Sequence, residues 1–184
     1  MDILHTSVNI IERGAKMNKS LKGSLNKIPS HWKTESRIYG EACEFWIAEH
    51  YGCPVCSEGE LKKLTANEKS VDHQCSSCDE LFQAKAHKKS FEKRDGSVGF
   101  IGAEYATTVA SLEKEKKWNL ILVEYDKDSE EVKRVGTVLK ENITKDNVIP
   151  RKPLSENARR AGWQGCNFKF NKNVVNFGTG VASE

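Results

Sequence analysis

Two cysteine pairs constrain this chain more than any other feature of its sequence. Cys53 and Cys56 form one C-x2-C pair, Cys75 and Cys78 form a second, and residues 57–74 separate the pairs. Each C-x2-C turn can direct two thiolates toward one centre, and two such turns complete a tetrahedral set of soft ligands that suits Zn²⁺. Because four thiolates leave no coordination position open, we expect a structural zinc, with a redox-active pair as the alternative.

The remaining cysteines and the apolar pattern indicate where in the cell the protein is located. Cys43 and Cys166 stand apart from the pairs, and we expect them to be small core residues. The chain begins MDILHTSVNI, which lacks the charged and apolar regions of a signal peptide. No apolar run approaches the roughly 18 residues that a membrane helix needs. We therefore expect a cytoplasmic protein with no membrane segment, where disulfides are disfavoured.

Basic residues are clustered although the total charge is nearly balanced. Lys and Arg number 29 against 26 Asp and Glu. Residues 13–33 contain basic residues and no acidic ones, and basic residues also dominate 85–94 and 151–160. Clustered cations indicate a polyanionic partner such as DNA, and a solvated surface is the alternative.

The length of 184 residues suits one compact domain. We expect a loosely packed basic arm at 1–33 and a domain at 34–184 that includes a zinc-ribbon subdomain at about 53–78. Apolar spacing predicts helices, strands and turns in the following ranges. The helices are 35–50 and 102–117, the strands are 61–64, 70–74, 80–87, 119–125, 132–140 and 167–170, a turn is 66–68, and a short helical turn is 155–161. This order predicts an α/β fold with a mixed sheet flanked by helices.

Three polar residues on the strands around the second cysteine pair can form a catalytic site. Asp72 lies on the strand that leads into the pair, while Gln83 and Lys85 lie on the strand that leads out and share a face. If these strands pair antiparallel, Asp72 comes close to the other two. Asp72 and Gln83 would then offer oxygen ligands to Mg²⁺, and Lys85 would orient or deprotonate a water and offset phosphate charge. From spacing alone, exposed strand residues are the alternative.

A second candidate site is the segment around Trp163, which follows Arg151, Lys152, Arg159 and Arg160. Arginines can bridge phosphates or bind guanine edges, and a tryptophan beside them can stack on a base or wedge into a base step. The alternative is a Trp163 that packs into the core beneath solvated arginines.

Four segments together resemble the catalytic domain of the Dam-replacing family of restriction endonucleases. The resemblance runs from about Glu44 to Phe168. The segments are CPVC (53–56), VD (71–72) leading to CSSC (75–78), GAEYAT (102–107) and, above all, RKPLSENARRAGWQGCNF (151–168).

This resemblance implies a PD-(D/E)XK nuclease, a type II restriction enzyme with a zinc-binding insertion. Its substrate would be double-stranded DNA that carries N6-methyladenine in GATC. Asp72 matches the metal-binding aspartate, Gln83 the second ligand and Lys85 the lysine, while Glu44 matches an acid that can compensate for Gln83. The cysteines match zinc ligands, and Trp163 matches the tryptophan that is the candidate reader of the modified base.

Gln83 stands where the family pattern has Glu or Asp, so one negative charge is lost. Two alternatives therefore stay open: a zinc-ribbon DNA-binding protein with weakened catalysis, and a nuclease of branched or unusual nucleic acid. A double-strand cut needs two active sites or sequential nicks, so a homodimer on DNA is a further expectation.

Overall fold

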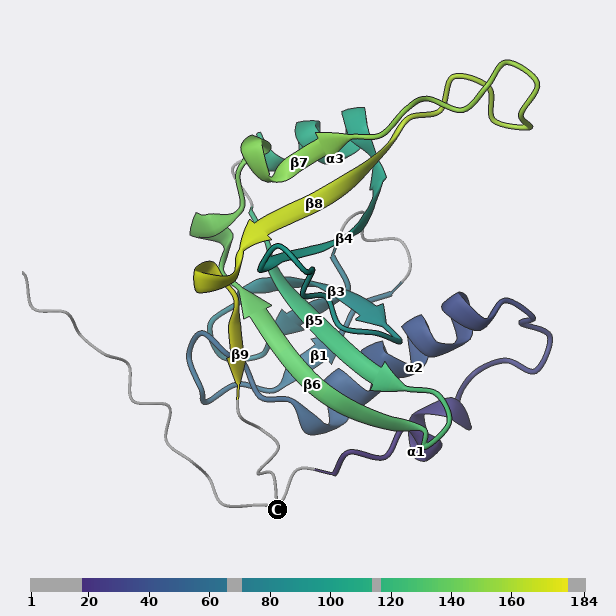
Figure 1. Cartoon of the computed structure of the whole chain (residues 1–184). Helices are drawn as coiled ribbons and strands as arrows, with labels where there is room; N and C mark the ends of the chain where they lie inside the picture. The colour runs from purple at the N-terminus through teal and green to yellow at the C-terminus, as the bar shows by residue number, and fades with distance from the viewer. Residues whose placement is uncertain (1–17, 66–70, 114–116, 179–184) are drawn as a thin grey trace, which may run out of the picture.

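The computed structural model of the chain describes residues 18–65, 71–113 and 117–178 (Figure 1). Its centre is a six-stranded mixed sheet in the order β1-β2-β3-β5-β6-β9, in which only β3 and β5 pair in parallel. The strands are β1 (Leu61–Lys63), β2 (His73–Cys75), β3 (Leu81–His87), β5 (Asn119–Asp126), β6 (Glu131–Val138) and β9 (Asn176–Gly178). The mixed sheet is thus confirmed.

β5 is an interior strand of this sheet, as its apolar sequence predicts. Residues 119–125 are all buried, without the alternation of a strand that has one face in water. Such continuous burial requires that both faces of the sheet be covered. The two covering layers differ, and this difference places the candidate site.

Helix α2 (Glu35–His50) covers one face and confirms the helix predicted at 35–50. Its buried side chains include Trp46 and Ile47, which belong to one hydrophobic core with Phe82, Ile121 and Val123 of the sheet. Burial of such large side chains contributes about 1.5–3 kcal/mol each, so this face is closed by apolar packing.

A second, three-stranded sheet covers the opposite face (Figure 1). It consists of β4 (Ser97–Glu104), β8 (Gly165–Asn171) and β7 (Val148–Pro150), in that order, and β4 leads into helix α3 (Tyr105–Leu112). Phe168 and Phe170 of β8 alternate with exposed Asn167 and Lys169. The two aromatic rings join the core on this side. Helix α2 thus flanks the mixed sheet as predicted, whereas a second sheet covers this face.

The prediction of a helix at 102–117 places its first residue too early. Gly102 to Glu104 belong to β4, and the helix starts at Tyr105. A Cβ atom at Gly102 would lie 2.5 Å from the Cys166 sulfur, so close strand packing, which local sequence does not reveal, requires glycine here. Residues 114–116 lie outside the described part of the chain.

Other boundaries also differ from the predictions. The strand predicted at 70–74 is assigned only from His73, and residues 66–70, with the predicted turn, lie outside the described residues. The helical turn predicted at 155–161 consists of hydrogen-bonded turns, for example from Ala158 N to Ser155 O (3.0 Å). The short strands β7 and β9 and the strand β4 were not predicted. Single-turn 3₁₀ helices lie at Lys140–Asn142, Lys145–Asn147 and Lys172–Val174.

Residues 18–33 are part of the folded body rather than a loosely packed arm. Helix α1 (Lys22–Leu25) lies beside α2, and Leu21 is fully buried in the core under that helix. The Leu21 amide donates to Glu130 O (2.8 Å), and the Trp46 indole donates to Asn18 O (2.8 Å). Residues 1–17 lie outside the described residues. None of the described helices is long and apolar enough to cross a membrane.

Candidate active site and metal centre

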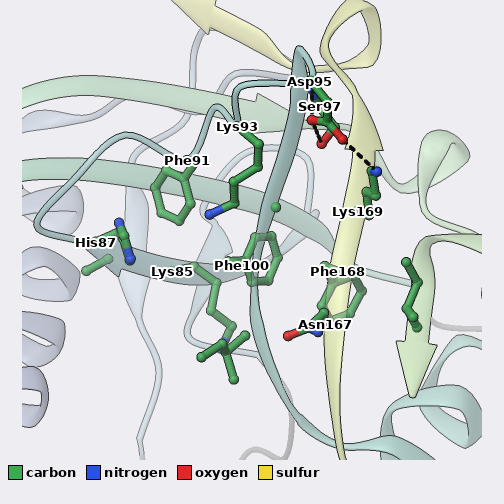
Figure 2. Close-up of a pocket in the computed structure, with 14 residues that line it drawn as sticks. Lys85, His87, Phe91, Lys93, Asp95, Ser97, Phe100, Asn167, Phe168 and Lys169 are labelled. Carbon is green, nitrogen blue, oxygen red and sulfur yellow. Dashed lines mark hydrogen bonds and ion pairs between the residues drawn. The ribbon is translucent and has the colours of Figure 1, made fainter. Parts of the chain in front are cut away.

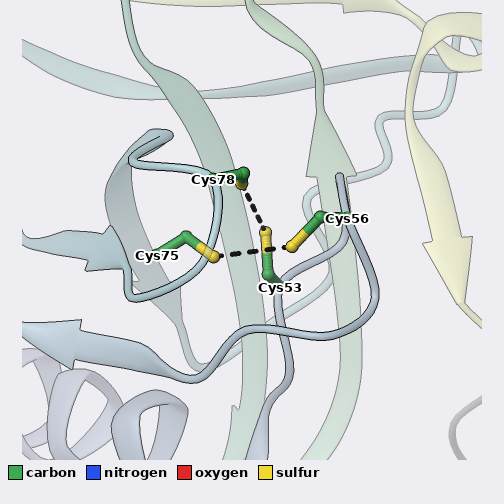
Figure 3. Close-up of side chains that lie close together, drawn as sticks. All are labelled: Cys53, Cys56, Cys75 and Cys78. Atoms are coloured by element: carbon green, nitrogen blue, oxygen red, sulfur yellow. Dashed lines mark hydrogen bonds between the residues drawn. The ribbon is translucent and has the colours of Figure 1, made fainter.

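The two cysteine pairs converge on one point (Figure 3). The four sulfur atoms lie within 4.8 Å of one another, with Cys53 to Cys78 at 3.8 Å and Cys56 to Cys75 at 3.6 Å. Four sulfurs about 2.3 Å from a tetrahedral zinc stand about 3.8 Å apart. The spacing predicted from the sequence is confirmed, and the cluster fits a structural zinc ion.

The backbone around the cysteines is shaped to hold them. Ser57 and Asp79, each directly after the second cysteine of a pair, have positive φ of 61° and 57°. This conformation turns the chain back so that both thiols of a pair face inward. A Cβ atom at Gly59 would overlap the Cys75 sulfur. Backbone N–H groups, first that of Glu58, lower the pKa of Cys56 to about 7, which favours the thiolate.

Cys43 and Cys166 lie away from this cluster. Both are buried, and burial raises the pKa of each thiol. The prediction that they are small core residues is confirmed.

The second cysteine pair connects β2 to β3, and the two strands pair antiparallel. His73 lies opposite Phe82, and the Asp72 amide donates to Phe82 O at 2.8 Å. Continuing this register sets Asp72 opposite Gln83. The Asp72 Oδ2 atom accepts the Ala84 amide at 2.7 Å, so this carboxylate is fixed at the point where β2 and β3 diverge. The expected proximity of Asp72 and Gln83 thus follows from the strand register.

Lys85 is two residues beyond Gln83 on the same face of β3 and is partly buried. It makes no ion pair with any residue of the described ranges. Burial lowers the pKa of Lys85, and the nearby carboxylates of Asp72 and Glu44 oppose this effect. A lysine of lowered pKa beside carboxylates can take up a proton or offset negative charge.

Glu44 reaches this region from α2. Its backbone oxygen is 2.8 Å from the Nε2 of buried His73, and its side chain forms a 2.7 Å ion pair with Lys63. Burial raises the pKa of Glu44, with a further contribution from the Asp72 charge, whereas Lys63 opposes the shift. Three oxygen-bearing side chains therefore approach this region. Glu44 comes from α2, Asp72 directly precedes β2, and Gln83 comes from β3. Such hard donors fit Mg²⁺.

A cleft of about 520 Å³ opens beside this region (Figure 2). Lys85 and His87 of β3 lie on one side of it, and residues of the small sheet form the other. Asp72 and Gln83 are not among its lining residues. Lys85 is thus the member of the predicted trio that faces the cleft.

The Arg-rich segment forms a hairpin loop that projects from the ends of β7 and β8 (Figure 1). Its four basic residues are exposed. They are Arg151, Lys152, Arg159 and Arg160. Trp163 is partly buried and belongs to neither core, which rules out the core alternative.

The indole of Trp163 has two close neighbours. The Arg160 guanidinium lies 4.6 Å from the ring centroid. A Cβ atom at Gly165 would come within 2.9 Å of the ring. The glycine therefore lets the indole lie directly on the backbone of β8, with an arginine over it.

Two contributors to this region were missed by sequence reasoning. Lys63 pairs with Glu44, and His73 ties α2 to β2 through the Glu44 backbone. The sequence spacing between Glu44 and either residue has no recognised pattern, because the contacts depend on how α2 packs on the sheet. Lys93 lies in the cleft as well, and only its membership of a basic cluster pointed to it.

Comparison with protein families identifies the class of this chain. Residues 21–176 match the model of DpnI, the Dam-replacing family. The chain therefore belongs to the Dam-replacing family, as the motifs of the sequence predict. Membership implies a restriction-type nuclease with DNA as its substrate.

Proposed function

We propose that this protein is a Mg²⁺-dependent type II restriction endonuclease of the PD-(D/E)XK kind. It hydrolyses phosphodiester bonds of double-stranded DNA in the cytoplasm. The observation that carries this proposal is the pairing of β2 with β3, which sets Asp72 opposite Gln83, with Lys85 next along the same face at the cleft.

The proposed chemistry assigns each side chain a role. Asp72, Gln83 and Glu44 would hold Mg²⁺ through oxygen. Asp72 Oδ2 accepts the Ala84 amide, while Oδ1 accepts no hydrogen bond from the described residues. When bound, Mg²⁺ supplies positive charge that stabilises the charge developing on the phosphate. Lys85 orients the attacking water and accepts its proton, a role that its burial favours by lowering the pKa.

Zinc has a structural role in this proposal. Cys53, Cys56, Cys75 and Cys78 would bind it, and the second pair is the connection between the two catalytic strands. The metal therefore holds the register on which the proposed active site depends. A separate zinc-ribbon subdomain at about 53–78 remains part of the proposal.

The projecting hairpin is the proposed site of DNA recognition. Its arginines and Lys152 contact phosphates or guanine edges, and Trp163 contacts the N6-methyladenine of the recognition sequence. Since each chain has one proposed active site, a double-strand cut requires either a homodimer on DNA or two sequential nicks.

Digestion of plasmid DNA tests this function. Plasmids grown with and without adenine methylation are incubated with the zinc-loaded protein, with Mg²⁺ present or withheld. We expect discrete fragments only with Mg²⁺ and only from methylated plasmid. Intact plasmid under all conditions would contradict the nuclease assignment, and equal cutting of both plasmids would contradict the methylation dependence.

The alternative is a DNA-binding protein in which Gln83 has weakened catalysis. An amide brings no negative charge, so metal affinity is lower than with a carboxylate at this position. The variant Gln83→Glu separates the two readings, with Gln74→Glu on the neighbouring strand as control. If Gln83→Glu alone converts an inactive protein into a nuclease, the alternative is correct; comparable activity before and after the change favours the nuclease.

A further inference from the structure

Lys93 is a cleft residue that the proposed active site does not use. It belongs to the basic cluster at 85–94, whose side chains lie in different surroundings. Lys88 pairs with Glu35 of α2 at 3.4 Å. Lys85 and Lys93, by contrast, both line the cleft. Lys93 forms no ion pair with any residue in the described ranges, so its charge is available to a ligand.

A tight turn fixes the position of Lys93. Its amide donates to Ser97 O (2.7 Å), and its carbonyl accepts the Gly96 amide (3.0 Å), with Gly96 at φ +75°. The side chain lies across Gly99, where an added Cβ atom would be 3.6 Å from Lys93 Cε. Figure 2 shows that Lys93 and Lys85 extend toward the same side of β4.

The residues before Lys93 anchor the turn to the main sheet. Phe91 is 1% exposed within the core. Glu92 Oε1 accepts from the Arg134 guanidinium at 2.9 Å, and Arg134 also donates to buried Glu124 at 2.8 Å. Two carboxylates thus bind one arginine. The segment that carries Lys93 is anchored before this residue by Glu92 and after it by the turn to Ser97. The backbone that carries Lys93 is therefore ordered before a ligand binds.

The outer face of the small sheet continues the cleft past Lys93. Ile101 of β4, Asn167 of β8 and Ile149 of β7 lie side by side across the three strands. Ile101 is 64% exposed, and the amide of Asn167 lies at the cleft in Figure 2. This wall offers apolar surface, an amide and one free ammonium.

A charge contrast along β8 marks where an anion would bind. Lys169, two residues beyond Asn167, is neutralised by Asp95 at 2.9 Å, and Asp95 also accepts from the Ser97 hydroxyl at 2.6 Å. Among the residues that the structure describes, the charge of Lys93 has no such counter-ion. An anion in this part of the cleft would therefore be drawn toward Lys93 and Lys85, away from the Asp95 end.

We propose that Lys93 and Asn167 bind the DNA phosphate that neighbours the one cut beside Lys85. The outer face of the small sheet then carries that strand toward the Arg-rich hairpin. This inference rests on the proposed function. Gly165, at the base of the hairpin, is two residues from Asn167, about 7 Å along the strand, so the proposed phosphate site lies near the base of the hairpin.

The test is the salt dependence of binding to a 20-base-pair duplex without Mg²⁺, so that no cleavage intervenes. Each phosphate that a cation neutralises contributes about 0.9 to the slope of log K against log salt. We expect Lys93→Met to reduce the slope by about this amount, and Lys93→Arg to retain it. Lys127→Met is the matched control, because Lys127 is an exposed lysine that pairs with Glu35 on the α2 side. It should leave the slope unchanged.

Equal slopes for Lys93→Met and wild type would overturn the inference, and so would equal reductions in Lys93→Met and Lys127→Met. Because the assay measures binding alone, its result is independent of cleavage. A protein that binds with the expected slopes but does not cut plasmid with Mg²⁺ would contradict the proposed function and leave the phosphate site standing. A protein that cuts plasmid with Mg²⁺ but whose Lys93→Met variant leaves the slope unchanged would contradict the phosphate site and leave the proposed function standing.

Discussion

The cysteine cluster and the carboxylate site lie at opposite ends of β2 and differ in how they are assembled. Both C-x2-C turns carry their ligands on adjacent backbone, and all four sulfurs already lie at tetrahedral spacing. The oxygen donors of Asp72, Gln83 and Glu44 come instead from β2, β3 and α2, and Glu44 is paired with Lys63.

This difference separates a site that holds the chain together from one that can react. The cluster leaves no coordination position open, whereas the carboxylate site borders a cleft through Lys85. In the proposed function, zinc at the first site maintains the register of β2 and β3, on which the second site depends.

Loss of zinc should have the largest effect, because it acts on folding. Cys75→Ser removes a buried ligand, and structural zinc contributes about 10–16 kcal/mol in small zinc domains. A typical domain has a net stability of only about 5–15 kcal/mol. We expect Cys75→Ser to lose bound zinc and melt at a markedly lower temperature, as measured by metal analysis and thermal unfolding. Cys166→Ala, outside the cluster, should keep its zinc. An unchanged melting temperature and zinc content in Cys75→Ser would contradict a structural zinc at the cysteine cluster.

Removal of the Lys85 amine should act on cleavage and leave the fold intact. A positioned acid–base group contributes about 10²–10⁴-fold, so we expect Lys85→Met to slow single-turnover cleavage by roughly that factor. Lys169→Met, at the other end of the cleft and already neutralised by Asp95, is the control and should have little effect.

The pH dependence sharpens this prediction. The neutral amine is the form that accepts a proton, and its fraction increases with pH up to the pKa. Because burial lowers the pKa of Lys85, the cleavage rate should rise with pH and level off below the pKa of a free lysine. A rate that falls over this range, or a profile that Lys85→Met leaves unchanged, would contradict a role for Lys85 as a base.

A smaller effect is expected at the hairpin, which affects selectivity rather than chemistry. Gly165→Ala places a methyl group against the Trp163 ring and should displace it. Base stacking on an aromatic side chain is worth about 1–3 kcal/mol, so we expect roughly tenfold weaker discrimination between methylated and plain duplex. Gly40→Ala, where an added Cβ atom meets nothing within 4 Å, is the control. Unchanged discrimination in Gly165→Ala would show that the position of Trp163 does not set selectivity.

The elements that the sequence predicted correctly are those with strong local patterns. The helix at 35–50 has apolar residues at helical spacing, and β5 contains the apolar block Leu120–Val123. β4 was missed because Gly99 and Gly102 interrupt its pattern, although both are glycines for reasons of strand packing. β7 and β9 have three residues each, too few for periodicity to reveal. Of the three-stranded layer, only β8 was therefore predicted from local sequence, as the strand at 167–170.

The candidate sites follow the same division. The cysteine spacing alone identified its cluster, and the strand pairing of Asp72 with Gln83 followed from the hairpin connection. The contributions of Lys63 and Lys93 could not be predicted, because they arise from the packing of α2 and from the turn before β4. Contacts between elements distant in sequence require the three-dimensional structure.

Substitution of Asp72 tests the central claim most directly. Asp72→Asn keeps an oxygen that can accept the Ala84 amide, so the strand junction should survive while the negative charge is lost. Asp95→Asn is the matched control, since Asp95 likewise accepts a backbone amide, that of Ser97, and lines the cleft that Lys85 faces. With zinc content and DNA binding equal in all three proteins, we predict that Asp72→Asn abolishes Mg²⁺-dependent cleavage while Asp95→Asn retains it. Cleavage by Asp72→Asn at a rate close to that of the wild type would contradict the account.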